Sequence, residues 1–392
     1  MKLRIAACVA LALFVSACKT RPDYSRPLPP GAPALIELKP GEKRPDFATE
    51  FARRSEILPA VERSIAWTRS KHAAQFFPKE GITLERAIAS LERFREILQQ
   101  CATEQEFKAI VDEEFTIYKS AGWDAKGGGV LYTAYCTPIL KGSRTPAPGY
   151  GYPLYALPPD LVKNKEGDIL GRKLADGSLE PYPTRQAIEA NHVLEGRSLE
   201  LAWLADPLDA YIAHVNGSAI VELPDGSELK LGYAGKNGHD YTSLGGELVK
   251  DKKLKADEVS LQRIRDWGKQ NPAELQKYMA RNASYVFFTP IEGNPRGCLN
   301  FEVTPGRSIA TDKELFPRAA LCFIASHPDQ SQRIGSFALD QDRGGAIRTA
   351  GRADIYLGIG PEAERDAGKT RVEGQLYYFF LKPSALARRP QP

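Results

Sequence analysis

The clearest hydrophobic periodicity in the chain lies between Thr83 and Ser120, where apolar residues recur at intervals of three and four. This spacing places them on one face of an α-helix. Thr103 and Glu106 interrupt the run with the spacing of a capping box, which marks the start of a second helix. The pattern therefore predicts two amphipathic helices. Their apolar faces are Leu84, Ile88, Leu91, Phe94 and Leu98, and then Phe107, Ile110, Val111 and Phe115.

From Gly129 the pattern changes to strand-like alternation rich in tyrosine, and it breaks at residues 143–149, which contain two prolines and a glycine. Beyond the break, residues 209–223 and 228–233 flank the sequence Pro-Asp-Gly-Ser at 224–227. Aspartate and glycine adopt turn conformations at little cost, so this arrangement predicts a β-hairpin. The segment as a whole is expected to be rich in strands.

A helix pair is expected next, with Asn271 capping its second member, Pro272 at the first helical position and Glu274 completing a capping box. After Asn282 the pattern is strand-rich as far as Leu381. The fold class expected from these elements is mainly β with helices (α+β), and the shifts in pattern favour two domains.

Three aspartates follow or occupy apolar runs in the last strand-rich segment. Asp342 and Asp354 are separated by a glycine-containing turn, and Asp354 lies beside Ile355 and Tyr356. Apolar neighbours desolvate a carboxylate, which raises its pKa toward the range in which it can donate a proton. Asp354 is therefore a candidate general acid. Asp312 ends another apolar run and could converge with the other two in one barrel.

The amino terminus reads as a bacterial lipoprotein signal: two basic residues, an apolar run from Ile5 to Ala17, and small residues before Cys18. Residues 1–17 are expected to be cleaved and Cys18 lipidated. A retained transmembrane anchor is the alternative, although the run is shorter than the roughly 20 residues that a spanning helix needs. Residues 18–46 are rich in proline, glycine and charge, which predicts a flexible tether.

The charge, the hydrophobic content and the spacing of cysteine and histidine limit the functional classes to be expected. The formal charge of +4, with 42% hydrophobic and 26% charged residues, fits a globular protein and gives no reason to expect nucleic-acid binding. The chain contains no Cys-x-x-Cys or His-x-x-x-His spacing, so neither a metal site nor another cofactor is expected. Four cysteines remain beyond the signal and could pair in an oxidising periplasm, in a pattern that the sequence leaves open. They are Cys101, Cys136, Cys298 and Cys322.

Asp312, Asp342 and Asp354, in this order and context, resemble the three-Asp double-psi β-barrel of the membrane-bound lytic murein transglycosylase A family. The resemblance extends from about Gly129 to about Leu381 through several ordered blocks. These blocks are residues 132–138, 152–160, 201–203, 233–239 and 284–288. Arg343 stands where the family more often has a small hydroxyl residue, and Thr349 stands where it often has glycine.

The resemblance implies a double-psi β-barrel domain formed by residues 47–142 plus 285–392. A second, smaller β-barrel-like domain, residues 143–284, is inserted into it, and a groove between the two holds the glycan. The implied activity is cleavage of the β-1,4 bond between N-acetylmuramic acid and N-acetylglucosamine, with formation of a 1,6-anhydro sugar. Asp354 would be the single acid/base, Asp342 its charged neighbour and Asp312 an orienting residue, although the last two could only cap turns.

Further residues are candidates for substrate binding: Tyr132, Tyr135, Thr137, Lys236, Asn237, His239, Tyr241, Gly344 and Gly345. The tyrosines could equally belong to the core, and the two glycines could only supply turn geometry. The expected location is the outer membrane, facing the periplasm, with peptidoglycan strands and possible cell-wall synthesis or division proteins as partners. A lysozyme-like hydrolase and a non-catalytic murein-binding lipoprotein are the alternatives. Preference for peptide-bearing or naked glycan, processivity and oligomeric state cannot be read from the sequence.

Overall fold

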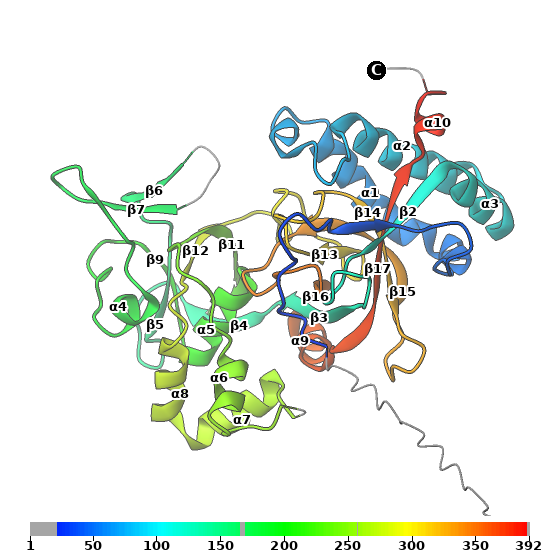
Figure 1. Ribbon diagram of the computed structural model, residues 1–392. Coiled ribbons are helices and arrows are strands. Elements are labelled where there is room, and N and C mark those ends of the chain that lie inside the picture. Colours follow the sequence, from blue (N-terminus) through cyan, green and yellow to red (C-terminus); the bar gives the residue numbers. More distant parts are fainter. Residues whose placement is uncertain (1–21, 165–168, 257, 390–392) are drawn as a thin grey trace, which may run out of the picture.

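The computed structural model describes residues 22–164, 169–256 and 258–389. They form a mixed α+β molecule of two lobes, in which a larger barrel lobe carries three long helices and a smaller lobe is built on a second sheet (Figure 1). The expected signal peptide and Cys18 lie outside the described residues. Within these residues, no helix combines the length and the apolar character needed to cross a bilayer.

The larger lobe contains an eight-stranded sheet in the order β1-β2-β17-β14-β15-β13-β16-β3. Strand β17 also pairs with β3, so the last six strands close into a barrel. Closure leaves these strands without a free edge. The strands are β1 Leu35–Glu37, β2 Phe115–Ser120, β3 Val130–Thr137, β13 Ser308–Ala310, β14 Leu321–Ser326, β15 Gly335–Asp342, β16 Arg352–Ile359 and β17 Val372–Leu381.

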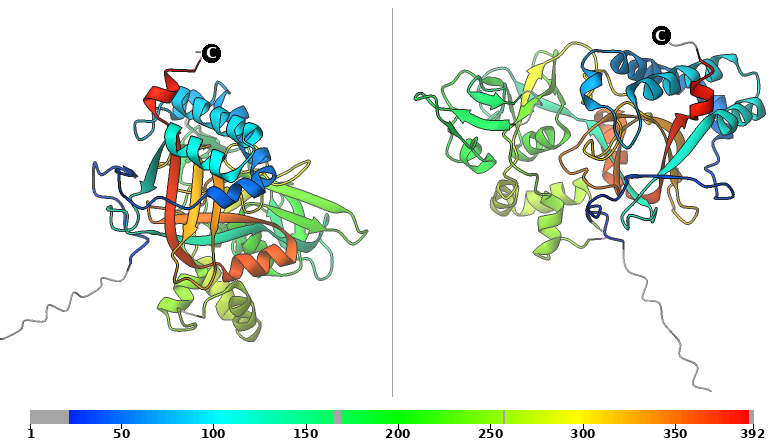
Figure 2. Two further views of the ribbon diagram at one scale, coloured as in Figure 1. Left: turned by 90° about the vertical axis from the view of Figure 1, so that its right-hand side faces the viewer. Right: turned by 45° about the horizontal axis from the view of Figure 1, so that its top comes forward.

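Helices α1 (Arg54–Thr68), α2 (Leu84–Gln100) and α3 (Glu104–Glu114) lie together over one side of the barrel (Figure 2). The second and third are the predicted amphipathic pair. Thr103 accepts from the Glu106 amide at 3.1 Å, while Glu106 accepts from the Ala102 amide at 2.8 Å. The sequence pattern did not reveal α1.

The expectation that helix continues to Ser120 is wrong. Helix α3 ends at Glu114, and Phe115 begins strand β2, which pairs with β17. Phe115 and Ile117 alternate with more exposed neighbours and enter the core shared by the helices and the barrel. Strand pairing therefore overrides the helical spacing of Phe115.

The smaller lobe is built on a six-stranded sheet in the order β12-β11-β10-β4-β9-β5, with a separate three-stranded sheet β6-β7-β8. The expected limits of the inserted domain, 143 and 284, exclude β4 and β12, which nevertheless pair with β10 and β11 in this sheet. The strands are β4 Ile139–Ser143, β5 Tyr152–Tyr155, β6 Leu161–Lys163, β7 Ile169–Lys173, β8 Leu179–Glu180, β9 Glu200–Leu204, β10 Ala219–Glu222, β11 Glu228–Lys236 and β12 Val286–Pro290.

The predicted hairpin is present as β10 and β11, but residues 209–216 are helical rather than extended. Asp206 caps this helix by accepting from the Leu208 amide at 2.8 Å, and Gly217 ends it at φ +71°. The helices of this lobe are α4 Arg185–Glu189, α5 Pro207–Asn216, α6 Leu244–Lys250, α7 Leu261–Gln270 and α8 Pro272–Ala280. Shorter elements elsewhere are η1 Ala48–Arg53, η2 Ala73–Phe76, α9 Gly360–Lys369 and α10 Pro383–Leu386.

The predicted capping box at α8 is wrong, although Pro272 does open the helix. The Asn271 side chain donates to the Trp267 carbonyl at 2.9 Å and so serves the end of α7 instead. The two lobes are joined by α7, where Arg265 donates to Asp209 at 2.6 Å and to Glu364 of α9 at 3.1 Å.

Two further expectations need correction. Part of the predicted tether is folded, because Leu35–Glu37 forms β1 and pairs with β2, while Ala34 is fully buried. None of the cysteine pairings considered from the sequence is formed among the described residues. Cys101, Cys136, Cys298 and Cys322 are all free thiols.

A buried ion pair fastens the helical layer to the barrel. Arg307 directly precedes β13 and is 2% exposed; it contacts Glu50, which is 6% exposed, and donates to Glu56 at 2.8 Å. Its guanidinium also donates to the Phe337 carbonyl of β15 at 3.1 Å. Glu50 also pairs with Arg53 at 3.3 Å, but Arg53 is far more exposed, so Arg307 is the buried one of these two cationic partners.

We expect Arg307→Met to lower the free energy of unfolding by about 3 kcal/mol, because it removes the buried counter-charge of Glu50 and leaves the more exposed Arg53 as the partner of this carboxylate. Urea unfolding of both proteins measures the difference. Arg95→Met is the matched control, since it removes an arginine from a more exposed pair with Glu62 and should cost less than about 1 kcal/mol. Equal effects of the two substitutions would contradict this account.

Candidate active site

Strand β13 brings two of the three predicted aspartates together. Its residue Ala310 pairs with Asp342 of β15 on one side and with Asp354 of β16 on the other. On its far side, β16 runs parallel to β3, which places Asp354 opposite Thr133. The two carboxylates therefore flank a single residue of the barrel, at a position that the strand register fixes.

Asp354 is in a largely desolvated site. Burial raises the pKa of its carboxyl group to about 6, and the negative charge of Asp342 adds to the increase. Two groups act in the opposite direction: Thr133 donates to Asp354 Oδ1 at 2.7 Å, and the charge of Arg352 favours the carboxylate. Burial outweighs both, so the expected rise in the pKa of Asp354 is confirmed.

Arg352 and Thr133 form a relay beside the acid. Arg352 Nη2 donates to Thr133 Oγ1 at 3.1 Å, and Thr133 in turn donates its hydroxyl proton to Asp354. Arg352 and Asp354 are two residues apart on one strand and so share a face of the sheet. Neither Arg352 nor Thr133 was predicted as a site residue from the sequence, although this alternation is a signal for Arg352.

Asp342 has a different environment. The Tyr135 hydroxyl donates to its Oδ2 at 2.6 Å, and the backbone amides of Cys298 and Arg343 donate to Oδ1 at 2.9 and 2.8 Å. Burial raises the pKa of Asp342, while these three hydrogen bonds favour its ionised form. Burial is the largest of these effects, and the three hydrogen bonds hold the Asp342 carboxyl group beside Asp354 in a fixed orientation.

Asp312 hydrogen-bonds neither of the other two aspartates in the structure. Its Oδ1 accepts from the Glu314 amide at 3.1 Å, and its Oδ2 accepts from the Thr349 amide at 2.9 Å. Thr349 adopts φ +76°, an unfavourable conformation for a β-branched residue, and its hydroxyl donates to the Tyr24 carbonyl at 2.7 Å. Asp312 and Tyr24 thus hold the loop between Asp342 and Asp354 from two sides.

A fourth aspartate in this region, Asp340, belongs to the core. It is fully buried and contacts the Lys313 ammonium, while Thr311 and Tyr378 donate their hydroxyls to it at 2.7 and 2.9 Å. A buried carboxylate with this many partners is satisfied structurally. Asp340 is thereby separated from the two acids that flank Ala310.

Three of the residues predicted to bind substrate are instead occupied inside the protein. Tyr132 is fully buried and donates to the Gln375 carbonyl at 2.5 Å. Thr137 is buried beside Tyr356 and Ser218, and the Asn237 amide donates to the carbonyls of Pro183 and Ala283. The expectation that these side chains contact the glycan directly is wrong, because burial and protein partners leave them no free polar group.

The remaining candidates lie closer to the surface. His239 Nε2 is 2.7 Å from the Tyr182 carbonyl, which occupies that ring nitrogen. Gly345 lies against Tyr241, since a Cβ at Gly345 would be 3.6 Å from the tyrosine Cβ. At Gly344 a Cβ would come within 2.9 Å of Ile347, so the tight turn leaves no room for a side chain.

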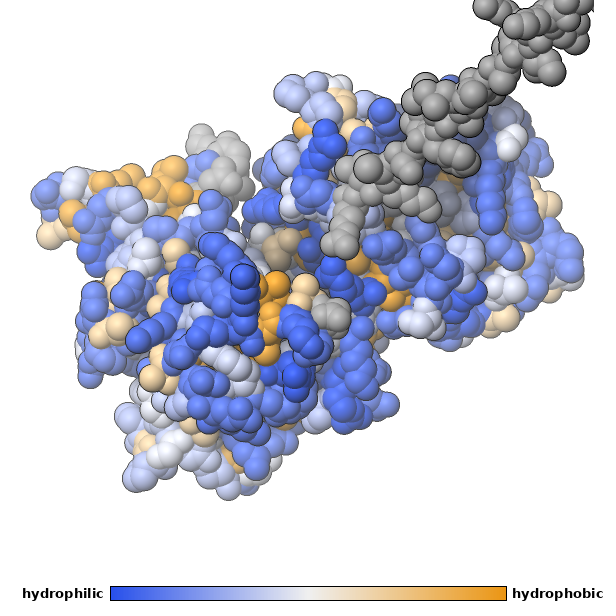
Figure 3. Space-filling model, turned by 60° about the horizontal axis from the view of Figure 1, so that its bottom comes forward, coloured by the Kyte–Doolittle hydropathy of each residue, from blue (hydrophilic) through white to orange (hydrophobic). Residues whose placement is uncertain are grey.

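The face that both lobes share is mainly hydrophilic and is hollowed where the lobes meet, with apolar groups exposed inside the hollow (Figure 3). Tyr233 of β11 is 45% exposed and offers a ring to the solvent. Across residues 22–164, 169–256 and 258–389, no three His, Cys, Asp or Glu side chains gather as a metal site would require. The chemistry available here is proton transfer by a buried carboxylic acid beside a fixed negative charge.

Two family models match the chain: the MltA specific insert domain over residues 131–289 and the 3D domain over residues 307–380. Membrane-bound lytic murein transglycosylase A of Escherichia coli K12 is 31% identical over 276 residues, which are 67% of this chain and 70% of that protein. The Vibrio cholerae protein of the same name is 29% identical over 272 residues, 67% and 68% of the two chains.

Solved structures show the same fold. A membrane-bound lytic murein transglycosylase from Agrobacterium tumefaciens aligns with TM-score 0.75 and 24% identity, covering 91% of this chain and all of that one. Escherichia coli MltA with bound chitohexaose aligns with TM-score 0.64 and 23% identity, covering 93% and 97%. Together with the family models and the 31% identical relative, these similarities show that the chain belongs to the membrane-bound lytic murein transglycosylase A family.

Proposed function

We propose that this protein is a lytic murein transglycosylase that cleaves the β-1,4 bond between N-acetylmuramic acid and N-acetylglucosamine. The observation that carries the proposal is a single buried carboxyl group, Asp354, whose pKa of about 6 allows it to donate a proton. Murein is the substrate class of the named relatives, and the Escherichia coli structure with chitohexaose supports a β-1,4-linked glycan in the groove.

In the proposed reaction, protonated Asp354 gives its proton to the glycosidic oxygen as the bond to the muramic C1 breaks. The C6 hydroxyl of the same muramic residue then attacks C1 and passes its proton to the Asp354 carboxylate. This forms the 1,6-anhydro ring and restores the acid without adding water. Because the nucleophile is in the same sugar, correct geometry replaces an effective concentration of about 10⁵–10⁸ M.

The ionised Asp342 would stabilise the positive charge that develops at C1. Its three hydrogen bonds keep it oriented without a proton, and its charge also helps to keep Asp354 protonated. Asp312 would act as a positioning residue through Thr349 and the loop that carries Arg343 to Gly351. In this scheme one carboxyl group performs both proton transfers.

A lysozyme-like hydrolase is the second candidate, because Asp354 and Asp342 are two carboxyl groups in one site. Such an enzyme needs the second carboxylate free to activate water or to attack the sugar. Asp342 already accepts one hydroxyl and two amide hydrogen bonds, which favours the transglycosylase. The products distinguish the two, since hydrolysis leaves reducing muramic ends and transglycosylation leaves anhydro ends.

The proposed location is the periplasmic face of the outer membrane, with Cys18 as the lipidated residue. The sequence signal at residues 1–18 supports this, and the named relatives are membrane-bound. Stable anchoring would require more than one acyl chain on that end. We also propose cell-wall synthesis or division proteins as partners.

We expect purified full-length protein to release anhydro-muropeptides from sacculi, and Asp354→Asn to lower that rate by about 10²–10⁴-fold, because the amide cannot transfer the proton. Mass spectrometry of the soluble products measures both the rate and the end group. Asp329→Asn is the control, since Asp329 lies exposed in a loop of the barrel lobe. Anhydro products persisting in Asp354→Asn would remove Asp354 from this role, and no products from either protein would favour a binding lipoprotein.

The reaction should require the protonated form of Asp354, so kcat/KM should fall as pH rises through about 6. Thr133→Val removes a hydrogen bond that favours the carboxylate, which raises the pKa of Asp354 and moves this limb to higher pH. Initial rates on soluble murein strands between pH 4 and 9 measure the shift. Thr137→Val, on the same strand but bonded to Ser218 and Tyr356, should leave the limb in place; a shift to lower pH in Thr133→Val would refute the role of Thr133.

A further inference from the structure

Three cationic side chains from separate segments lie near residues 343–351, the loop between Asp342 and Asp354 that we call the catalytic loop. Arg343 directly follows β15, Lys236 ends β11, and Lys163 ends β6. Lys163 Nζ donates to the Ala234 carbonyl of β11 at 3.2 Å, and the Arg343 side chain hydrogen-bonds the Tyr233 hydroxyl of the same strand. Strand β11 is therefore the element on which the three cations meet.

The cluster of Lys163, Lys236 and Arg343 lacks the close carboxylates that pair with many other cations in the described part of the chain. Among the residues that the structure describes, none of the three forms an ion pair within 4.0 Å. Burial and the charge of Arg343 lower the pKa of Lys163, and burial together with Arg348 and Arg343 lowers that of Lys236, while the charge of Asp240 raises it only in part. The cluster therefore carries unrelieved positive charge.

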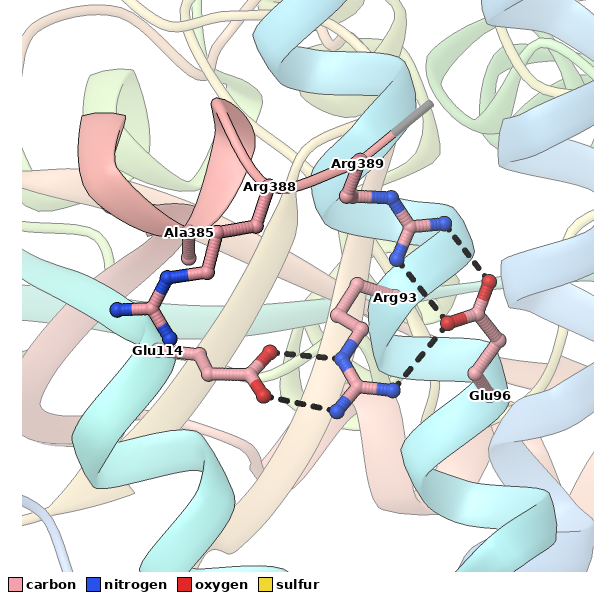
Figure 4. A pocket seen from close by; sticks show the side chains of 6 residues that line it. All are labelled: Arg93, Glu96, Glu114, Ala385, Arg388 and Arg389. Atoms are coloured by element: carbon pink, nitrogen blue, oxygen red, sulfur yellow. Dashed lines mark hydrogen bonds and ion pairs between the residues drawn. The ribbon is translucent and has the colours of Figure 1, made fainter. Parts of the chain in front are cut away.

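A pocket at the other end of the barrel lobe shows the contrast. There Arg93 donates to Glu114 at 2.7 Å, and Arg389 donates to Glu96 at 2.7 Å, so each guanidinium faces a carboxylate (Figure 4). These two arginines are therefore neutralised by partners inside the protein. The cluster on β11 leaves its positive charges open to a ligand.

The cluster also lies at the rim of the proposed active site. The Arg343 amide donates to Asp342 Oδ1 at 2.8 Å, so the exposed Arg343 side chain starts one residue from the charged neighbour of Asp354. Two residues further, Gly345 packs against Tyr241, whose pKa is raised mainly by burial and to a smaller degree by the charge of Asp354. A glycan held at Asp354 would therefore pass within reach of these cations.

We propose that Lys236 and Arg343, supported by Lys163, form a binding site for the carboxylates that murein carries beside its sugar chain. The inference rests on the proposed function and names a property of the substrate. Polymers of N-acetylglucosamine are neutral, whereas each muramic residue bears a lactyl group. In peptide-stripped strands the lactyl carboxylate is free. In intact strands it forms an amide bond to a peptide, and that peptide carries carboxylates of its own. The shared chemistry is an anion that accepts charge-assisted hydrogen bonds from guanidinium and ammonium groups.

The test measures binding to full-length Asp354→Asn protein, in which the glycan stays uncut. Three ligands are compared: chitohexaose, peptide-stripped murein strands and peptide-bearing strands. We expect Arg343→Gln and Lys236→Met each to weaken murein binding about tenfold, the value of one charge-assisted hydrogen bond, and to leave chitohexaose binding unchanged. Arg343→Lys should recover part of the loss, and Arg388→Gln, an exposed arginine of the pocket in Figure 4, should have no effect.

Loss confined to stripped strands would assign the site to the lactyl carboxylate, and loss confined to peptide-bearing strands would assign it to the peptide. Equal weakening for chitohexaose would overturn the inference, because the residues would then bind sugar rather than acid. Unchanged murein binding in both variants would also overturn it and would leave the cluster as solvated charge. Failure of the Asp354→Asn protein to bind any of the three ligands would instead refute the proposed function.

Discussion

The burial of the Asp354 carboxyl group is the constraint on which the rest of the site depends. Asp354 lies on a strand that is hydrogen-bonded on both sides, to β13 and to β3, so the barrel fixes the position of its backbone. Its pKa of about 6, against 3.8 in the unfolded chain, means that its ionisation is disfavoured in the folded state. Below about pH 4 the carboxyl group is protonated in both states, so the free energy of unfolding is unaffected. Above about pH 6 the buried charge lowers the free energy of unfolding by about 3 kcal/mol.

Hydrogen bonds from two other parts of the chain hold the loop between Asp342 and Asp354. Asp312 accepts from the Thr349 amide, and the Thr349 hydroxyl donates to the Tyr24 carbonyl. The segment that leads from the amino terminus is therefore in direct contact with the catalytic loop, and then continues into β1.

Features that depend on neighbouring residues alone could be predicted from the sequence. The helices at 84–100 and 104–114, the turn at Asp225–Gly226 and the elevated pKa of Asp354 follow from periodicity, turn chemistry and apolar neighbours. Prediction failed where a local start signal was overlooked and where tertiary pairing decides. Residues 209–216 are as apolar as a strand, yet Asp206 and Pro207 start a helix there.

The same distinction between local and long-range causes applies to the residues of the candidate site. Tyr132, Thr137 and Asn237 carry groups that suit sugar binding, but long-range partners such as Gln375 and Ala283 occupy them. No local pattern could have shown those contacts. The β13 register that sets Asp342 and Asp354 on either side of Ala310 is equally a property of the closed barrel. Within the site, the alternation of Arg352 and Asp354 was open to prediction and missed.

Titration of the Asp354 carboxyl carbon by NMR, in protein labelled with ¹³C at aspartate and assigned against Asp354→Asn, tests the central claim most directly. The account predicts a midpoint near pH 6 for this carbon. A midpoint near 4, the ordinary value for an exposed aspartate, would show that the barrel does not keep the group protonated, and Asp354 could not then be the general acid.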